Sequence, residues 1–163
     1  MILSTKGRYA VMAMVELASQ HAEKPINLSF IAEKQEIPLA YLEQIFAKLR
    51  RANMVDSVRG PGGGYRLAKP AADTMIAEII LAAEESLRMT RCENTGHAGC
   101  MAPKTRCLTH DLWDGLGNQI FNYLSAISLE DVVKRRVKQR HLHDTPHASQ
   151  FADLVLHEAN TTA

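Results

Sequence analysis

Apolar residues recur every three or four positions over much of the first half of the chain, and this spacing predicts amphipathic helices. The first helix is expected between Ser4 and Gln20, with Tyr9 and Leu17 near the two ends of its apolar stripe. A hydroxyl side chain, that of Ser4 or Thr5, is the expected N-terminal cap. The stripe would form one side of a hydrophobic core.

Two further helices are predicted close together. Ser29 can cap a short helix over 30–35, which ends before Pro38 because a residue that precedes proline is disfavoured in a helix. Pro38 fits the first turn of the next helix, whose apolar face includes Leu42 and whose expected end is Asn53. A short helix, a tight turn and a longer helix form the helix-turn-helix pattern.

The hydrophobic period changes after this helix pair. The stretch MVDSVRG alternates apolar and polar residues, PGGG supplies a turn and YRL returns, so residues 54–67 predict a two-stranded hairpin. A hairpin that directly follows a helix-turn-helix is interpreted as a wing. Three glycines in a row predict either positive φ angles or a close approach of the backbone to another group.

Helical spacing resumes at 74–87, and a long apolar stripe runs over 112–127. Because the second stripe is too apolar to be left in water, its expected partner is the same helix of a second chain in a two-fold homodimer. Ser128 and Asp131 predict the capping pair of a short last helix.

Together these elements predict a mainly α fold with a small β-hairpin wing and a long dimerisation helix. The expected divisions are a winged helix-turn-helix domain at 1–88, a loop at 89–111, the long helix and a short following helix at 112–137, and a polar, His-rich, disordered tail at 138–163. No stretch reads as a membrane span or a cleaved leader, so we expect a cytoplasmic protein with no membrane partner.

The distribution of charged residues along the chain indicates a kind of partner. The formal net charge is only +1, but residues 1–70 hold ten Lys or Arg against six Asp or Glu. Around the predicted hairpin, Asp56 alone opposes a basic group made of Lys48, Arg50, Arg51, Arg59, Arg66 and Lys69. Such a concentration of positive charge indicates contact with a polyanion.

The helix-turn-helix and wing therefore predict a protein that binds double-stranded DNA operator sites. The first turns of a recognition helix meet base edges, where Gln44 can pair with adenine and Glu43 can accept from cytosine. Glu43 also repels phosphate, so it is a candidate for selectivity, and Arg59 beside the wing tip suits a narrow minor groove. The candidate DNA-binding residues are Leu39, Ala40, Tyr41, Glu43, Gln44, Lys48, Arg50, Arg59, Gly60, Gly62 and Gly63.

All three cysteines lie in one polar stretch, CENTGHAGCMAPKTRCLTH at 92–110, which ends in a histidine. In a reducing cytosol, clustered thiols favour metal or redox chemistry over disulfides, and an odd number cannot pair within one chain. Three thiolates and one imidazole suit either zinc or an iron-sulfur cluster. Only Cys107 and His110 form a close pair, and the wide spacing of the others favours the larger group. His97 in the same stretch is interpreted as an exposed loop residue.

Several stretches resemble the IscR-type iron-sulfur-cluster regulators, a family of dimeric winged-helix transcription factors. They are LSTKGRYAV at 3–11, YLEQIFAKLRR at 41–51, SVRGPGGGY at 57–65, and RC followed by CLTHDLW, which ends at Trp113. The resemblance implies dimerisation through the long helix, discrimination between classes of DNA site by Glu43, and repression or activation of cluster-assembly genes according to cluster occupancy. Cluster-donating assembly proteins are further expected partners. The implied ligands of a [2Fe-2S] cluster are Cys92, Cys100, Cys107 and His110.

Three alternatives stay open at this stage. A regulator of the same family could sense nitric oxide or oxidants, or hold zinc at the Cys/His site. An enzyme could use Cys107 and His110 as nucleophile and base, but no acidic or oxyanion-stabilising group accompanies the pair, so we expect no enzyme. A purely structural helical dimer is disfavoured by the basic wing.

Overall fold

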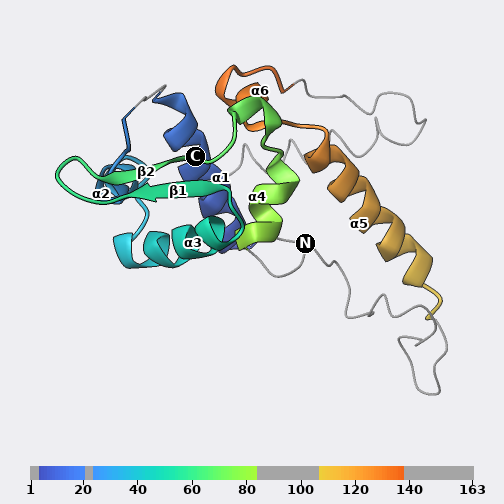
Figure 1. The fold of residues 1–163 in the computed structure, drawn as a ribbon. Coiled ribbons are helices and arrows are strands. Elements are labelled where there is room, and N and C mark those ends of the chain that lie inside the picture. Colours follow the sequence, from blue (N-terminus) through green and yellow to red (C-terminus); the bar gives the residue numbers. More distant parts are fainter. Residues whose placement is uncertain (1–3, 21–23, 84–106, 138–163) are drawn as a thin grey trace, which may run out of the picture.

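The computed structural model describes residues 4–20, 24–83 and 107–137. Over these ranges the chain is mainly helical with one two-stranded antiparallel hairpin, which confirms the predicted fold class (Figure 1). The elements are α1 (Thr5–Ser19), α2 (Leu28–Lys34), α3 (Leu39–Arg51), β1 (Val55–Val58), β2 (Gly64–Leu67), the 3-10 helix η1 (Ala71–Asp73), α4 (Ile76–Ala83), α5 (His110–Ser125) and α6 (Leu129–Val133). We call α1 through α4, with the hairpin, the winged domain.

The first two helices begin at polar caps, one of which was predicted wrongly. Ser4 caps α1 as expected, and its hydroxyl accepts from the Gly7 amide at 3.4 Å. The cap of α2 is Asn27 rather than Ser29: the Asn27 side-chain oxygen accepts from both the amide (2.9 Å) and the hydroxyl (3.0 Å) of Ser29. The helix starts earlier because Leu28 belongs to its buried face.

The turn of the helix-turn-helix is compact. Glu36 takes a positive φ of 53°, Ile37 is buried, and Pro38 is the N-cap of α3 rather than its first-turn residue, because its ψ of 126° is extended. At the other end of α3, Asn53 has a φ of 55°, a conformation that asparagine tolerates. This confirms the predicted end of the helix.

The wing is attached to the segment that leads into α2. Its strands pair with Val55 opposite Leu67, as the alternating pattern requires. Tyr65 makes a second pairing, with Ile26: each amide donates to the other's carbonyl at 2.8 Å. The Tyr65 ring also packs edge-on against Phe46 of α3, with centroids 4.9 Å apart. The hairpin and the helix-turn-helix therefore form one packed body.

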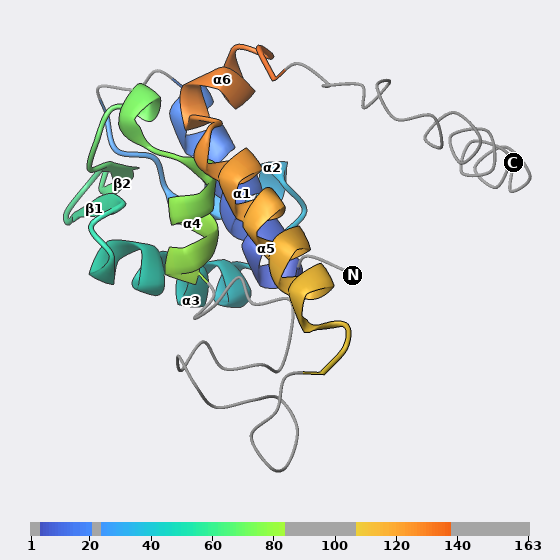
Figure 2. The same cartoon turned by 90° about the vertical axis from the view of Figure 1, so that its right-hand side faces the viewer.

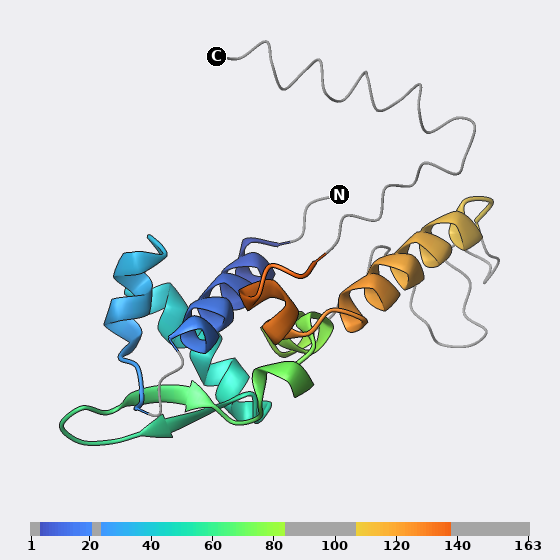
Figure 3. The ribbon, with the colours of Figure 1, turned by 90° about the horizontal axis from the view of Figure 1, so that it is seen from above.

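The core lies between α1, α3 and α4, and α6 closes one end of it. Met14, Phe46 and Ile79 are fully buried there, and Leu129 of α6 joins them with 0% exposure. Helix α5 contacts α4 and extends away from the winged domain, as the views from the front and from above both show (Figures 1 and 3). Figure 2 views the molecule from this side, so α5 lies in front of the winged domain there.

The junction between α5 and α6 is bonded to the start of α4. The Ile76 amide donates to the Ile127 carbonyl at 3.0 Å, and the Leu129 amide donates to the Thr74 carbonyl at 2.8 Å. Met75 and Ser128 face each other in this short antiparallel bridge. The far end of α5 is thus fixed to the chain that leaves the wing.

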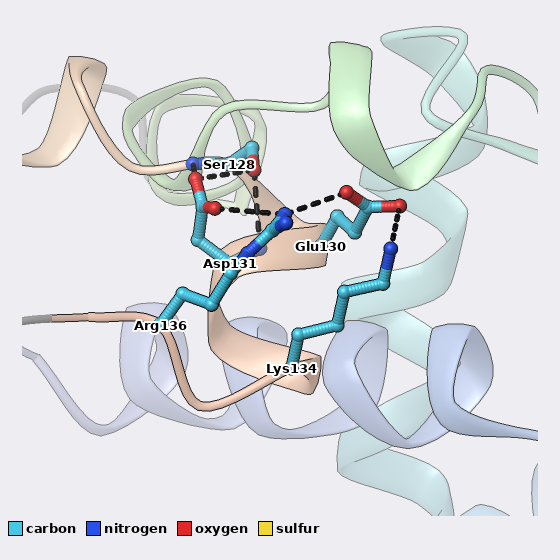
Figure 4. A network of polar contacts seen from close by, with 5 residues as sticks. All are labelled: Ser128, Glu130, Asp131, Lys134 and Arg136. Carbon is cyan, nitrogen blue, oxygen red and sulfur yellow. Dashed lines mark hydrogen bonds and ion pairs between the residues drawn. The ribbon is translucent and has the colours of Figure 1, made fainter.

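The predicted capping pair after α5 is confirmed and extends into a polar network (Figure 4). The Asp131 amide donates to the Ser128 hydroxyl and the Ser128 amide donates to the Asp131 carboxylate, each at 3.1 Å. Arg136 pairs with Glu130 at 2.6 Å and with Asp131 at 3.1 Å, while Lys134 pairs with Glu130 at 2.8 Å. Hydrogen bonds from Lys134 and Arg136 lower the pKa of Glu130, and those from Ser128 lower the pKa of Asp131.

Two boundaries differ from the sequence-based expectation. The long helix begins at His110, so this histidine lies on a helix rather than in the loop assigned to 89–111. The helix expected over 74–87 is seen as Ile76–Ala83, and 84–87 lie outside the described residues, as do most of the loop and the 138–163 tail. Among the described helices, none has the length and apolar character needed to span a membrane.

Candidate DNA-binding face and metal ligands

Helix α3 has one face in the core and one in solvent. Its inward residues are Leu42, Ile45, Phe46 and Leu49, all fully buried. The predicted base-reading residues alternate with them, and the exposed ones are Leu39, Ala40, Glu43 and Gln44. This separation leaves the first turns of α3 accessible to a partner.

Tyr41 differs from the other candidates on α3. It is half-buried, and its ring stands edge-on to that of Tyr9 on α1, with centroids 5.8 Å apart. Part of its role is therefore to pack α3 against α1. A contact to DNA from this residue would have to come from the part of the ring that remains exposed.

The basic residues near the hairpin are arranged around the C-terminal end of α3. Lys48 is half-buried, whereas Arg50 is exposed and donates to the Ser57 hydroxyl of β1 at 3.4 Å. Asp56 faces Arg66 directly across the hairpin at 3.4 Å. Because both partners are more than half exposed, this ion pair adds little stability, but it offsets the negative charge of Asp56.

The glycines of the wing show both properties expected from the sequence. Gly60 and Gly62 have φ angles of 104° and 76°, which disfavour any residue with a Cβ. A Cβ at Gly63 would lie 2.5 Å from the Val58 carbonyl oxygen, and one at Gly64 would collide with the backbone of Ile26. Arg59 is exposed immediately before this turn. The tip is thus narrow, with its backbone uncovered beside a guanidinium.

Two of the four predicted metal ligands lie in the described part of the chain. His110 is the first residue of α5, and its amide donates to the Cys107 carbonyl at 3.0 Å, which closes a turn. The Cys107 sulfur lies 3.7 Å from the Thr109 hydroxyl, and both Cys107 and His110 are half-buried. Cys92 and Cys100, like His97, lie outside the described residues. Within the described ranges, no three His, Cys, Asp or Glu side chains gather as a metal-binding group.

The chemistry of this turn fits an anionic metal group. A thiol and an imidazole three residues apart on one turn can ligate the same inorganic body. The N-terminal end of a helix carries partial positive charge, which suits an anionic group nearby. A hydroxyl close to the sulfur, here that of Thr109, could donate to a ligating sulfur.

Helix α5 has no fully buried residue among those described. Leu124 packs against the core of the winged domain, as does Ile127 just after the helix. The largest exposed apolar side chains of the helix are Leu112, Trp113, Phe121 and Tyr123, which are 41% to 64% exposed. Among the residues that the structure describes, only part of the predicted apolar stripe is therefore covered.

One polar residue of the core was not singled out by the sequence reasoning. Glu16 lies on α1 between Ala13 and Leu17 of the buried stripe and is 5% exposed. The signal was present in the sequence, because a carboxylate falls at a core spacing there. Two of its partners, Lys34 and Gln35, lie at the end of α2 and could not be identified from the helical period alone.

Comparison with known proteins agrees with this architecture. The family model described as "Rrf2: Iron-dependent Transcriptional regulator" matches residues 3–135. The HTH-type transcriptional regulator IscR of Photorhabdus laumondii is 49% identical over 136 residues, which cover 83% of this chain and 81% of that protein. These relatives are regulators rather than enzymes, in agreement with the sequence-based prediction.

Solved structures give the same result. The T. potens IscR structure matches with a TM-score of 0.67 and 33% identity, over 86% of this chain and 92% of that one. The structure of CymR, the global cysteine regulator of B. subtilis, matches with a TM-score of 0.68 and 30% identity, over 83% of this chain and 98% of that one. The chain therefore belongs to the Rrf2 family of DNA-binding transcriptional regulators and is of the IscR type.

Proposed function

We propose that this chain is a homodimeric regulator that senses iron-sulfur cluster supply through a [2Fe-2S] cluster and controls cluster-assembly genes. The ligands would be Cys92, Cys100, Cys107 and His110. The observation that carries this proposal is the pairing of Cys107 and His110 on one turn at the start of α5. The fold alone does not assign the signal, since CymR shares it and is a cysteine regulator.

A histidine among three cysteines gives the site the character of a sensor. A bound cluster supplies a signal through its presence or absence. A neutral imidazole ligand in place of a fourth thiolate would leave the site less negative and would make one ligand bond sensitive to protonation. Such a site gives up its metal more readily than four thiolates would, so its occupancy follows supply.

The DNA-reading part of the proposal uses α3 and the wing. The exposed first turns of α3 would enter the major groove with Leu39, Ala40, Glu43 and Gln44 near base edges and part of Tyr41 beside them. Lys48 and Arg50 would hold phosphates. The wing tip, made of Arg59, Gly60, Gly62 and Gly63, would follow the minor groove.

The homodimer would form through α5. Its exposed apolar residues, Leu112, Trp113, Phe121 and Tyr123, are the kind of surface that a two-fold partner buries. A dimer also suits the task, because two recognition helices can then read half-sites about one DNA turn apart.

Helix α5 connects the proposed cluster ligands to the winged domain. Cys107 lies in the turn that leads into α5 and His110 is its first residue, and the segment after it is bonded through Ile127 and Leu129 to Ile76 and Thr74. A shift of α5 would therefore displace the segment between the wing and α4. We infer that occupancy changes the presentation of the two winged domains to DNA.

The test compares cluster-bound and metal-free protein in DNA affinity. Duplexes upstream of cluster-assembly genes from the host genome serve as probes, in fluorescence anisotropy without oxygen and at fixed salt. The proposal expects the two forms to differ in affinity for at least one class of duplex. Identical affinities for every duplex would overturn the sensor role. Protein that holds zinc or metal-free thiols after anaerobic purification would instead favour a regulator of the same family that binds zinc or senses nitric oxide or oxidants.

A further inference from the structure

Glu16 is an unusual residue for the interior of this domain. It is 5% exposed and is the one charged residue among the buried residues that the structure describes. Its carboxylate accepts hydrogen bonds from the Lys34 ammonium at 2.6 Å, from the Gln35 amide at 2.8 Å, and from the side-chain amide of Gln20. Both oxygens of this buried carboxylate therefore accept hydrogen bonds.

Two of the three donors lie at the turn of the helix-turn-helix, and the third, Gln20, is the C-cap of α1. Lys34 is the last residue of α2 and Gln35 is its C-cap. Glu36 follows with its positive φ, then the buried Ile37, and α3 begins directly after Pro38. The carboxylate on α1 is thus connected to the point where α2 ends and the chain turns toward α3.

The ionised state of Glu16 is maintained in spite of its burial. Burial raises the pKa, but hydrogen bonds from Lys34, Gln20 and Gln35 and the charge of Lys34 lower it further, so the pKa is below its usual value. A buried network of this kind contributes little net stability compared with well-packed apolar residues. What such a network can supply is a single arrangement of the elements that it joins.

We propose that Glu16 is a positioning residue for DNA recognition, which acts through Lys34 and Gln35 to fix the turn between α2 and α3. Base-edge hydrogen bonds tolerate displacements of only about 0.5 Å, so the first turns of α3 need a fixed start. Phosphate contacts are less demanding, because they are electrostatic and independent of sequence. Loss of Glu16 should therefore reduce specific binding more than non-specific binding.

This inference uses α3 as the reading helix and does not depend on a cluster. The probes are a duplex selected from a random library by the wild-type protein and a scrambled duplex of the same length and composition. The measured quantity is the ratio of the two dissociation constants at fixed salt. A merely structural residue would change the amount of folded protein but not this ratio.

Glu16→Gln removes the charge and turns an amide group toward the three donors. We expect the ratio to fall roughly tenfold, comparable to the loss of one base contact, with non-specific affinity and its salt dependence unchanged. Glu78→Gln is the matched control, because Glu78 is also paired with a lysine, Lys69 at 3.2 Å, but is exposed on α4. Its ratio should equal that of the wild type.

Gln35→Ala is the second variant and covers the case in which Glu16→Gln does not fold. It removes one donor from the carboxylate without leaving the charge unpaired, and we expect roughly a threefold fall in the ratio. A wild-type ratio in folded Glu16→Gln, or in Gln35→Ala if the first variant is unfolded, overturns the proposal. If the wild-type protein enriches no duplex from the library, α3 is not a sequence-reading helix, and the proposal fails for that reason.

Discussion

Gly64 at the start of β2 allows the wing to pack against the segment before α2, and replacing it with alanine tests this contact. A Cβ at Gly64 would collide with the Ile26 carbonyl and lie 2.9 Å from the Asn27 amide nitrogen. These are backbone atoms, so no side chain can turn away to make room. The Ile26–Tyr65 pairing must therefore open or shift in Gly64→Ala.

The magnitude follows from the contacts that would be lost. Two backbone hydrogen bonds of 2.8 Å join Ile26 and Tyr65, and each contributes about 1 kcal/mol net. Weakening of the Phe46–Tyr65 ring contact adds about 0.5–1 kcal/mol. The lower entropy of the unfolded chain with alanine offsets about 0.4–1 kcal/mol. We expect a net loss of about 2 kcal/mol in the free energy of unfolding.

Urea unfolding followed by circular dichroism measures this loss. With a denaturant dependence of about 2 kcal/mol/M, the midpoint should fall by about 1 M. Gly115→Ala is the control, because it is the same substitution at a glycine of α5 where no atom lies within 4 Å of the added Cβ; its stability should not fall below that of the wild type. A Gly64→Ala midpoint equal to that of the wild type would refute the reasoning.

Four further predictions concern the core, the wing, the proposed metal ligand His110 and pH. Leu129→Ala, which truncates a fully buried side chain, should cost about 2–5 kcal/mol in thermal unfolding, and a loss below about 1 kcal/mol would contradict the joining of α6 to the core. Arg59→Ala should weaken DNA binding roughly tenfold in anisotropy titrations, whereas unchanged affinity would remove it from the interface. His110→Cys should lengthen the lifetime of the visible absorbance in air, and equal lifetimes would count against the proposed role of the histidine. The pKa of Glu16 is below its usual 4.5, so the ionised carboxylate contributes fully to stability above pH 4.5, and this contribution is lost as the pH falls from there toward the lowered pKa. Between pH 6 and pH 3, Glu16→Gln should therefore lose less stability than the wild type, and equal losses would contradict this role of the carboxylate.

Features that depend on neighbouring residues could be predicted from the sequence. Ser4, Asn53 and the Ser128–Asp131 pair act within one helical turn, so residue type and spacing were sufficient. The error at Ser29 has a local cause too, because Asn27 is an equally good cap and Leu28 needed a place on the buried face. Competition between adjacent caps is decided by packing rather than by propensity.

Contacts between distant segments could not be predicted in this way. Ile26 pairs with Tyr65, and Thr74 and Ile76 bond to the residues after α5, yet nothing in a helical or strand period specifies these partners. The half-burial of Tyr41 against Tyr9 has the same origin. For the candidate metal ligands, the sequence predicted Cys107 and His110 as a close pair, and the structure joins them by one turn, but the position of His110 on a helix was not expected.

The proposed ligation of a [2Fe-2S] cluster by Cys92, Cys100, Cys107 and His110 is the central claim of the functional account. The most direct measurement is the visible absorption spectrum of the full chain after anaerobic purification, together with iron and sulfide analysis. We predict a coloured protein with roughly two irons and two sulfides per chain. A colourless protein that contains no iron and cannot be reconstituted with iron and sulfide would contradict the claim.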